Sequence, residues 1–144
     1  MAVVSVSTGD FRVEVEAGAH QLISDEAERL GGTDQGPDPF DLLAASLGAC
    51  TAIVVADAAR ARALVIDRVD VRVSAKFNKL PARPSDEQFA LVEFRRSIRI
   101  EADVSPEDLA WLYARGTDCP VSRALGAGVA IRTTIGSSTA DRRH

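Results

Sequence analysis

The sequence has few of the residues that mark several specialised classes of protein. Its two cysteines among 144 residues exclude a disulfide-rich scaffold. Its net charge of -4 leaves no basic excess, which a surface that binds nucleic acid or an anionic membrane would require. Aromatic residues make up only 5%, so alanine, valine, leucine and isoleucine must form the core. We therefore expect neither nucleic acid nor a membrane as a partner.

Long uninterrupted hydrophobic runs are also missing. The most apolar stretch, residues 42–59, is interrupted by Ser46, Thr51 and Asp57, so we expect no membrane-spanning segment. Residues 1–10 alternate in polarity and contain no basic residue, which disfavours a secretory signal. The sequence therefore predicts a cytoplasmic protein. In that reducing compartment a cysteine pair is more often catalytic or redox-active than structural.

The hydrophobic content of 46% is enough for a single domain, which we place at residues 1–136 with a polar tail at 137–144. β-Branched and alternating apolar residues predict strands at 3–8, 11–17, 20–24, 69–77, 89–101 and 129–135. In the strand at 89–101 the apolar phase shifts between Leu91 and Val92, which predicts a β-bulge. Together with three predicted helices, this order indicates an α+β fold.

The three helices are predicted from their start signals. Asp38 and Pro39 end the irregular loop GGTDQGPDP and fit the N-cap and first position of a helix that runs to about Leu64. This helix is apolar on nearly all faces, so we expect it to be covered on all sides. Ser105 is the expected N-cap of a second helix, and residues 118–120 begin a short third helix.

The two cysteines are the strongest candidates for chemistry. Cys119 precedes Pro120 at a predicted helix start, where free N–H groups and the helix dipole favour a thiolate. Cys50 lies within the apolar helix, where burial raises a thiol pKa and where a cysteine is often only a small buried hydrophobe. A metal site of Cys50, Cys119 and His20 is a weaker alternative without a CxxC pair. Ser46 lacks the glycine pattern of a hydrolase nucleophile.

Two cysteine-containing segments together resemble the OsmC/Ohr family of thiol-dependent hydroperoxide reductases. Residues 31–50, GGTDQGPDPFDLLAASLGAC, are similar to the family's loop and the helix that carries its first cysteine. Residues 118–125, DCPVSRAL, are similar to the block that contains its second cysteine. Residues 17–26, AGAHQLISDE, resemble the OsmC-like branch in particular. The resemblance extends over essentially the whole chain.

This resemblance implies a fold, an assembly and a reaction. The implied fold has antiparallel β-sheets wrapped around two central helices, with two chains intertwined as a homodimer. Cys50 matches the peroxidatic cysteine, which reduces an organic hydroperoxide to its alcohol and becomes a sulfenic acid. Cys119 matches the resolving cysteine, which forms a disulfide with Cys50 that an external dithiol reduces. The resemblance implies no metal and no cofactor, and a role in oxidative stress defence.

The sequence departs from the family pattern at the groups that activate the first cysteine. The reductases have a glutamate ten residues before that cysteine, where this chain has Phe40. Asp41 is nine residues before Cys50, about half a turn around a regular helix, so we expect it to act as a first-turn charge. Arg29 is our candidate for the activating arginine, with Arg12 as the alternative. An OsmC-like protein that binds a small molecule, or one that carries out other thiol chemistry, therefore remains an alternative function, as does a dimeric structural protein.

Arg123 adds a possibility that the family does not supply. It lies four residues after Cys119, so a helix from residue 118 places both on one face. A guanidinium there would favour the Cys119 thiolate and exchange the roles of the two cysteines. The alternative is that Arg123 faces solvent or pairs with Asp118.

Overall fold

The computed structural model describes residues 2–6, 11–79 and 89–134. The chain forms an α+β fold, as predicted. Its strands are β1 (Ala2–Val6), β2 (Val13–Ala17), β3 (His20–Ser24), β4 (Arg68–Lys79) and β5 (Phe89–Glu101). Its helices are the 3-10 turn η1 (Glu28–Leu30), α1 (Pro39–Ala61), α2 (Pro106–Thr117) and α3 (Pro120–Ala127).

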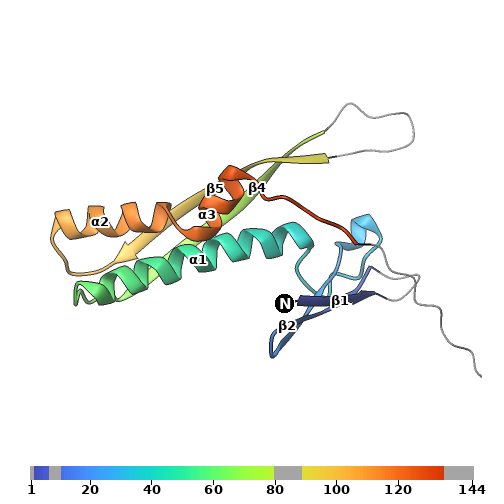
Figure 1. Ribbon diagram of the computed structural model, residues 1–144, viewed down its shortest axis with the longest axis horizontal. Helices are drawn as coiled ribbons and strands as arrows, with labels where there is room; N and C mark the ends of the chain where they lie inside the picture. Colours follow the sequence, from blue (N-terminus) through green and yellow to red (C-terminus); the bar gives the residue numbers. More distant parts are fainter. Residues whose placement is uncertain (1, 7–10, 80–88, 135–144) are drawn as a thin grey trace, which may run out of the picture.

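The strands form two separate antiparallel sheets. β1, β2 and β3 form a three-stranded meander, and β4 and β5 form a long hairpin. α1 runs along this hairpin, α2 packs against α1, and α3 follows α2 (Figure 1). The three-stranded sheet lies apart, at the N-terminal end of α1 (Figure 1). The α+β fold with antiparallel sheets agrees with the prediction, whereas within one chain it is mainly the β4–β5 hairpin that borders the helices.

The predicted bulge in β5 is confirmed, and it sets which residues face the helices. Lys76 pairs with Glu93 and Phe77 pairs with Leu91, so Val92 is the extra residue of β5. After the bulge, the even-numbered residues from 94 to 100 are half-buried or buried, whereas their odd-numbered neighbours are exposed. Arg96 is therefore the one charged residue in an otherwise apolar inward row of β5.

α1 begins as predicted and ends three residues early. The side chain of Asp38 accepts a hydrogen bond from the backbone N–H of Asp41 at 2.7 Å, and Pro39 occupies the first turn. The predicted helix ran to about Leu64, but the structure ends it at Ala61. Ala63 has a left-handed φ of 52°, which turns the chain toward β4 and stops the helix.

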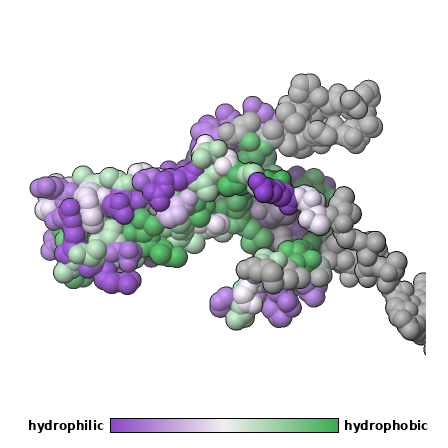
Figure 2. All heavy atoms as spheres, in the orientation of Figure 1, coloured by the Kyte–Doolittle hydropathy of each residue, from purple (hydrophilic) through white to green (hydrophobic). Residues whose placement is uncertain are grey.

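One face of α1 is covered within the chain and another is not. The covered residues follow a helical period and are Ala44, Leu47, Thr51, Val55, Ala58 and Ala59. On the opposite face Ile53 is 67% exposed. Hydrophobic residues are visible on the surface over α1 (Figure 2). The expectation that α1 is covered on all sides is therefore not met by a single chain.

α1 also meets the length and composition criteria for a membrane span, which the sequence analysis did not expect. Its most apolar 18-residue window has a mean hydropathy of 1.9. The core helix of a globular protein passes the same test, and α1 packs against β4, α2 and α3. These contacts indicate a core helix.

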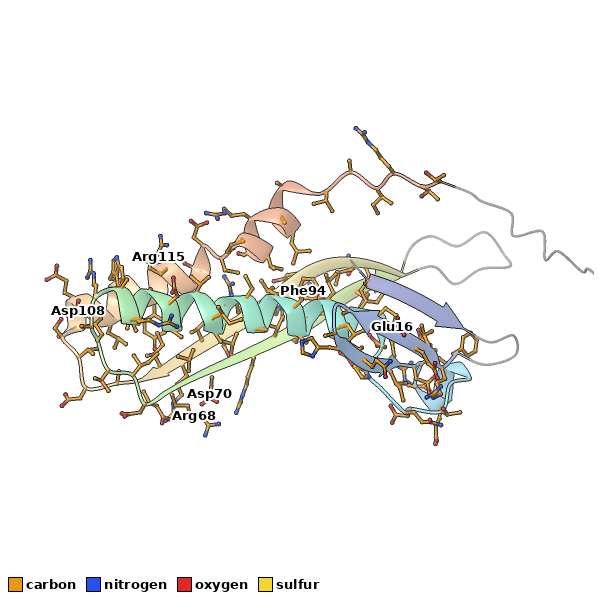
Figure 3. All side chains as sticks on the ribbon, turned by 60° about the horizontal axis from the view of Figure 1, so that its bottom comes forward. Glu16, Arg68, Asp70, Phe94, Asp108 and Arg115 are labelled. Atoms are coloured by element: carbon orange, nitrogen blue, oxygen red, sulfur yellow. The ribbon has the colours of Figure 1, made fainter. Side chains whose placement is uncertain are left out.

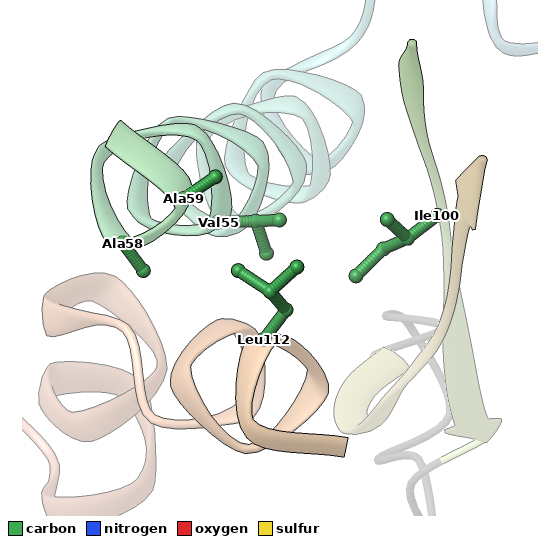
Figure 4. Close-up of a cluster of buried hydrophobic side chains, with 5 residues drawn as sticks. All are labelled: Val55, Ala58, Ala59, Ile100 and Leu112. Carbon is green, nitrogen blue, oxygen red and sulfur yellow. The ribbon is translucent and has the colours of Figure 1, made fainter. Parts of the chain in front are cut away.

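The core lies where α1, α2 and β5 meet. Leu112 of α2 is fully buried and points between Val55 of α1 and Ile100 of β5 (Figure 4). Gly116, at the end of α2, allows an especially close approach to α1. A Cβ atom at Gly116 would lie 2.8 Å from Val55 Cγ2, which is closer than van der Waals contact allows. This close packing places the start of α3 against the middle of α1.

The predicted last strand, at 129–135, is wrong over the residues that the structure describes. Residues 129–134 have no regular structure, and no strand within the described ranges pairs with them. Val129 is 71% exposed and Ile131 is 88% exposed. The β-branched alternation here favours a strand, but a strand forms only where a neighbouring strand supplies hydrogen bonds. Ile135 and the predicted tail at 137–144 lie outside the described residues.

A buried carboxylate holds the loop that leads into α1. Asp25 is 2% exposed and accepts hydrogen bonds from the backbone N–H groups of Glu26, Thr33 and Gln35. The Thr33 hydroxyl donates a further hydrogen bond at 2.6 Å. This hydroxyl contributes most to lowering the pKa of Asp25 below its ordinary 3.8; burial opposes it, and the three backbone donors add to it.

We expect Asp25→Asn to lower the urea midpoint of unfolding at pH 7, because an amide NH₂ cannot accept the hydrogen bonds that the carboxylate accepts. The folded pKa lies below the unfolded value, so the contribution of the carboxylate is present above about pH 4 and is lost as pH falls through the folded pKa. The difference between the two proteins should therefore shrink in acid. Asp34→Asn, at an exposed position of the same loop, is the matched control. Equal urea midpoints for Asp25→Asn and the wild type at pH 7 would contradict the stabilising role of the Asp25 carboxylate.

Candidate functional site

The fold brings together two cysteines that lie 69 residues apart in the sequence. Cys50 comes from the middle of α1, and Cys119 is the N-cap of α3. Cys50 is among the side chains that interact with the Cys119 thiol and lower its pKa. Both cysteines are free thiols. The two thiols therefore lie near each other, and the expected disulfide between them stays a prediction.

The two thiols differ in their access to solvent. Cys119 is 0% exposed, whereas Cys50 is half-buried. Cys119 Sγ accepts a hydrogen bond from the backbone N–H of Ser122 at 3.4 Å, as an N-cap side chain does. Thr51 Oγ1, one residue after Cys50 on α1, lies 3.7 Å from the same sulfur. A small molecule that enters from solvent therefore meets Cys50 more readily than Cys119.

The surroundings of Cys119 favour its thiolate. Burial is the largest single influence and raises the pKa of the Cys119 thiol. Hydrogen bonds from the Ser122 backbone, from Thr51, from Cys50 and from the Ser122 side chain all lower it. Together these hydrogen bonds outweigh burial, so the pKa of Cys119 lies below its ordinary value of 9.0.

Arg96 of β5 contacts Cys119, and it was not among the residues predicted from the sequence. Its Nη1 donates to Thr51 Oγ1 at 2.7 Å and lies 3.7 Å from Cys119 Sγ. Its Nη2 donates to the backbone carbonyl of Thr117 at 2.9 Å. The available signal was the position of Arg96 in the inward row of β5. That position becomes evident only once the bulge at Val92 is placed.

The structure places the predicted arginines elsewhere. Arg123 pairs with Asp118 at 3.3 Å, which is the alternative to a contact with Cys119. Arg12 forms an ion pair with Glu14 at 3.0 Å. Arg29 is exposed in η1, and no hydrogen bond or ion pair within the described residues joins it to either cysteine. The role of Arg29 in catalysis therefore stays a prediction.

Asp41 has the place that the sequence analysis expected. It lies in the first turn of α1, is exposed, and its backbone N–H donates to the N-cap residue Asp38. A negative charge in the first turn stabilises the helix through the helix dipole. Over the parts of the chain that the structure describes, no group of three or more His, Cys, Asp or Glu side chains could hold a metal ion.

An open cavity of about 660 Å³ lies beside residues that contact Cys119, and neither cysteine is among its lining residues. Arg96, Thr117 and Ser122, which surround Cys119, contribute to its wall. Phe94, which Figure 3 locates on β5 beside α1, is one of its apolar residues. The other apolar residues of the wall are Leu47, Leu91, Ile98 and Leu125.

Comparisons with known proteins find solved structures with a similar fold. Among solved structures, an OsmC-like protein of Mycoplasma pneumoniae superimposes with a TM-score of 0.69 at 17% identity, over 88% of this chain and 86% of the other. An organic hydroperoxide resistance protein OsmC of Legionella pneumophila gives 0.59 at 20% identity, over 87% and 88% of the two chains. An OsmC-like hydroperoxide resistance protein of Jannaschia sp. CCS1 gives 0.62 at 18% identity, over 96% and 91%. At these identities the likeness shows the fold.

A sequence comparison with curated proteins gives no match. The family model described as OsmC-like protein matches residues 32–134, which include both cysteines and most of the cavity wall. With this match over most of its length and with the same fold, the chain belongs to the OsmC-like protein family.

Proposed function

We propose that this protein is a cysteine-based peroxidase that reduces organic hydroperoxides to alcohols in oxidative stress defence. The observation that carries the proposal is the pair of adjacent free thiols of unequal accessibility, Cys50 half-buried and Cys119 fully buried. A thiol peroxidase requires one sulfur that meets the peroxide and a second sulfur that meets the first. Family membership and the hydroperoxide resistance proteins that share the fold add support.

In the first step, the Cys50 thiolate attacks one oxygen of the hydroperoxide. The new S–O bond forms as the O–O bond breaks, and the departing alkoxide takes a proton to become the alcohol. Cys50 is oxidised to a sulfenic acid and the hydroperoxide is reduced. Cys50 has this role because it is the more accessible of the two thiols.

In the second step, the Cys119 thiolate attacks the sulfur of the oxidised Cys50. An S–S bond forms, the S–O bond breaks, and hydroxide leaves with a proton as water. The lowered pKa of Cys119 increases the fraction of thiolate available near neutral pH. An external dithiol then reduces the disulfide by thiol–disulfide exchange, which returns both cysteines to thiols.

We also propose that the working form is a cytoplasmic homodimer. The described residues leave the apolar face of α1 around Ile53 exposed, and a second copy of the chain would bury it. Arg29 keeps its proposed role as the cation that activates Cys50. Since it makes no contact with Cys50 within the described part of one chain, this role requires the second chain to bring it there.

The direct test uses the reduced protein and one equivalent of cumene hydroperoxide, with no reductant present. We expect the peroxide to be consumed within seconds and mass spectrometry to identify a Cys50–Cys119 disulfide. With hydrogen peroxide the second-order rate constant should be lower by at least about tenfold. Each buried CH₂ of an organic substrate contributes about 0.8 kcal/mol of binding, and hydrogen peroxide has no such group. Unconsumed peroxide and two intact thiols would overturn the proposal, and equal rates with the two peroxides would overturn the substrate preference.

The cavity near Cys119 supports a second candidate function, the binding of a small molecule. A volume of about 660 Å³ with a wall of mixed apolar and polar residues is sufficient for a small organic molecule, so the protein can instead act as a binder or use other thiol chemistry. The same experiment separates the two functions, since a binder without peroxidase activity leaves cumene hydroperoxide unreduced.

A further inference from the structure

We propose that Arg96 is a positioning residue of the resolving half-site: its guanidinium holds Cys119 as a thiolate, aligned for attack on oxidised Cys50. Only one part of this inference, the attack of Cys119 on oxidised Cys50, rests on the proposed function. It assigns to a residue of β5 an effect on the second cysteine, distinct from any cation that activates the first.

The geometry of Arg96 is fixed from three sides. One nitrogen of the guanidinium contacts both Thr51 Oγ1 at 2.7 Å and Cys119 Sγ at 3.7 Å. The other terminal nitrogen donates to the Thr117 carbonyl at 2.9 Å, just before the turn that carries Cys119. Arg96 thus joins α1, the end of α2 and the start of α3. A guanidinium bound at both terminal nitrogens has one orientation, which is what alignment of the sulfur requires.

The position of Arg96 in the sheet argues for a specific use. Its neighbours in the inward row are Phe94, Ile98 and Ile100, and an unpaired charge in an apolar row is costly. Within the described residues no carboxylate forms an ion pair with Arg96, whereas the outward-facing Arg95 and Arg99 pair with Glu93 and Glu101. A thiolate at Cys119 is the anion that the geometry offers to this guanidinium.

Thr51 extends the effect of Arg96 to the sulfur. Arg96 donates to the Thr51 oxygen, so the single hydroxyl proton of Thr51 remains available to another acceptor. That proton has two acceptors within reach, the Leu47 carbonyl at 2.8 Å and Cys119 Sγ at 3.7 Å. When Cys119 is ionised, the hydroxyl can turn from the carbonyl to the sulfur. A hydroxyl polarised by a guanidinium is a stronger donor to a thiolate.

Few other ionisable or charged groups face Cys119 from the elements around it. α1 contributes Cys50, β5 contributes Arg96, and the start of α3 contributes Asp118 and Arg123, which are exposed and paired with each other. Removal of the Arg96 charge should therefore appear directly in the titration of Cys119.

The test measures the ionisation of Cys119 in a Cys50→Ser background, by thiolate absorbance at 240 nm against pH. This measurement needs no peroxidase activity. We expect Arg96→Gln to raise the midpoint by about one pH unit, since an opposite charge in contact shifts a pKa by about one to three units. Arg96→Lys should restore part of the shift, which a merely structural role would not do. Arg99→Ala, on the exposed face of the same strand, is the matched control and should leave the midpoint unchanged.

The kinetic arm uses the protein with both cysteines and cumene hydroperoxide. Arg96→Gln should slow the conversion of the Cys50 sulfenic acid to the disulfide at pH 7 about threefold or more. A midpoint that is one pH unit higher leaves about tenfold less Cys119 thiolate at pH 7. The higher nucleophilicity of a more basic thiolate offsets part of this loss, so the expected effect is about threefold. If circular dichroism shows that Arg96→Gln is unfolded, Arg96→Met is a second uncharged variant that tests the same effect on Cys119.

The outcomes separate the two proposals. An unchanged Cys119 midpoint in a folded Arg96→Gln or Arg96→Met protein overturns the role of Arg96, whatever the peroxidase result. Failure of the wild-type protein to form any sulfenic acid overturns the proposed function. The titration then still decides whether Arg96 stabilises the thiolate.

Discussion

Replacing Cys50 with serine is expected to lower kcat/KM for cumene hydroperoxide by about a thousandfold or more, because loss of a nucleophile removes the reaction path itself. Serine keeps the size of the side chain, so the fold and the packing of α1 should be retained. Peroxide consumption in the presence of a small dithiol, followed with matched circular dichroism spectra, measures the loss.

Cys119→Ser is the companion variant, and it distinguishes the roles of the two cysteines. It should still consume one equivalent of cumene hydroperoxide and accumulate a sulfenic acid at Cys50 that a dimedone-type reagent traps. Cys50→Ser should give no trapped product. The opposite pattern, with sulfenic acid trapped only at Cys119, would exchange the two roles. The complete burial of Cys119 argues against that exchange.

The second large effect is expected at the uncovered face of α1. Ile53 is 67% exposed in one chain, so in a monomer Ile53→Asp would be nearly neutral or would favour solubility. In a dimer that covers this face, the aspartate would be buried without a partner. Such a charge costs several kcal/mol, which weakens dimerisation by about a hundredfold or more. Sedimentation velocity at micromolar concentration should therefore find a dimer for the wild type and a monomer for Ile53→Asp.

The control for this experiment is Ala110→Asp, which places the same charge on an exposed position of α2. It should sediment as the wild type does. A wild-type monomer, or a dimer that Ile53→Asp leaves intact, would show that this face of α1 is not the interface. Since Arg29 depends on the second chain to reach Cys50, a monomer would also remove the proposed role of Arg29.

The sequence predicted those elements whose signals are local. β3, at His20–Ser24, and β5, at Phe89–Glu101, have the predicted bounds, and α3 begins at Pro120 as expected. Proline at a first helical position and alternation within a strand act over a few residues, so sequence alone reveals them. The bulge at Val92 was visible for the same reason, as a change of phase along a single strand.

Features that depend on distant partners were not predictable in this way. The segment at 129–134 has the composition of a strand, but pairing is decided by what lies beside it. Arg96 resembled any other arginine of a polar strand until the register of β4 and β5 and the packing of α3 placed it against Cys119. The proximity of the two cysteines was expected from the family resemblance, since their spacing alone does not specify a contact.

The absence of a side chain at Gly116 has a consequence for how proteins of this kind are identified from sequence. A Cβ at this position would lie 2.8 Å from Val55 and 3.3 Å from Ile98, so a larger residue would push the end of α2 away from α1. Cys119 follows three residues later and would move with it, away from Cys50. Two cysteines at the right separation are therefore an incomplete signature. In this chain the thiol pair also depends on a residue without a side chain three positions before the second cysteine.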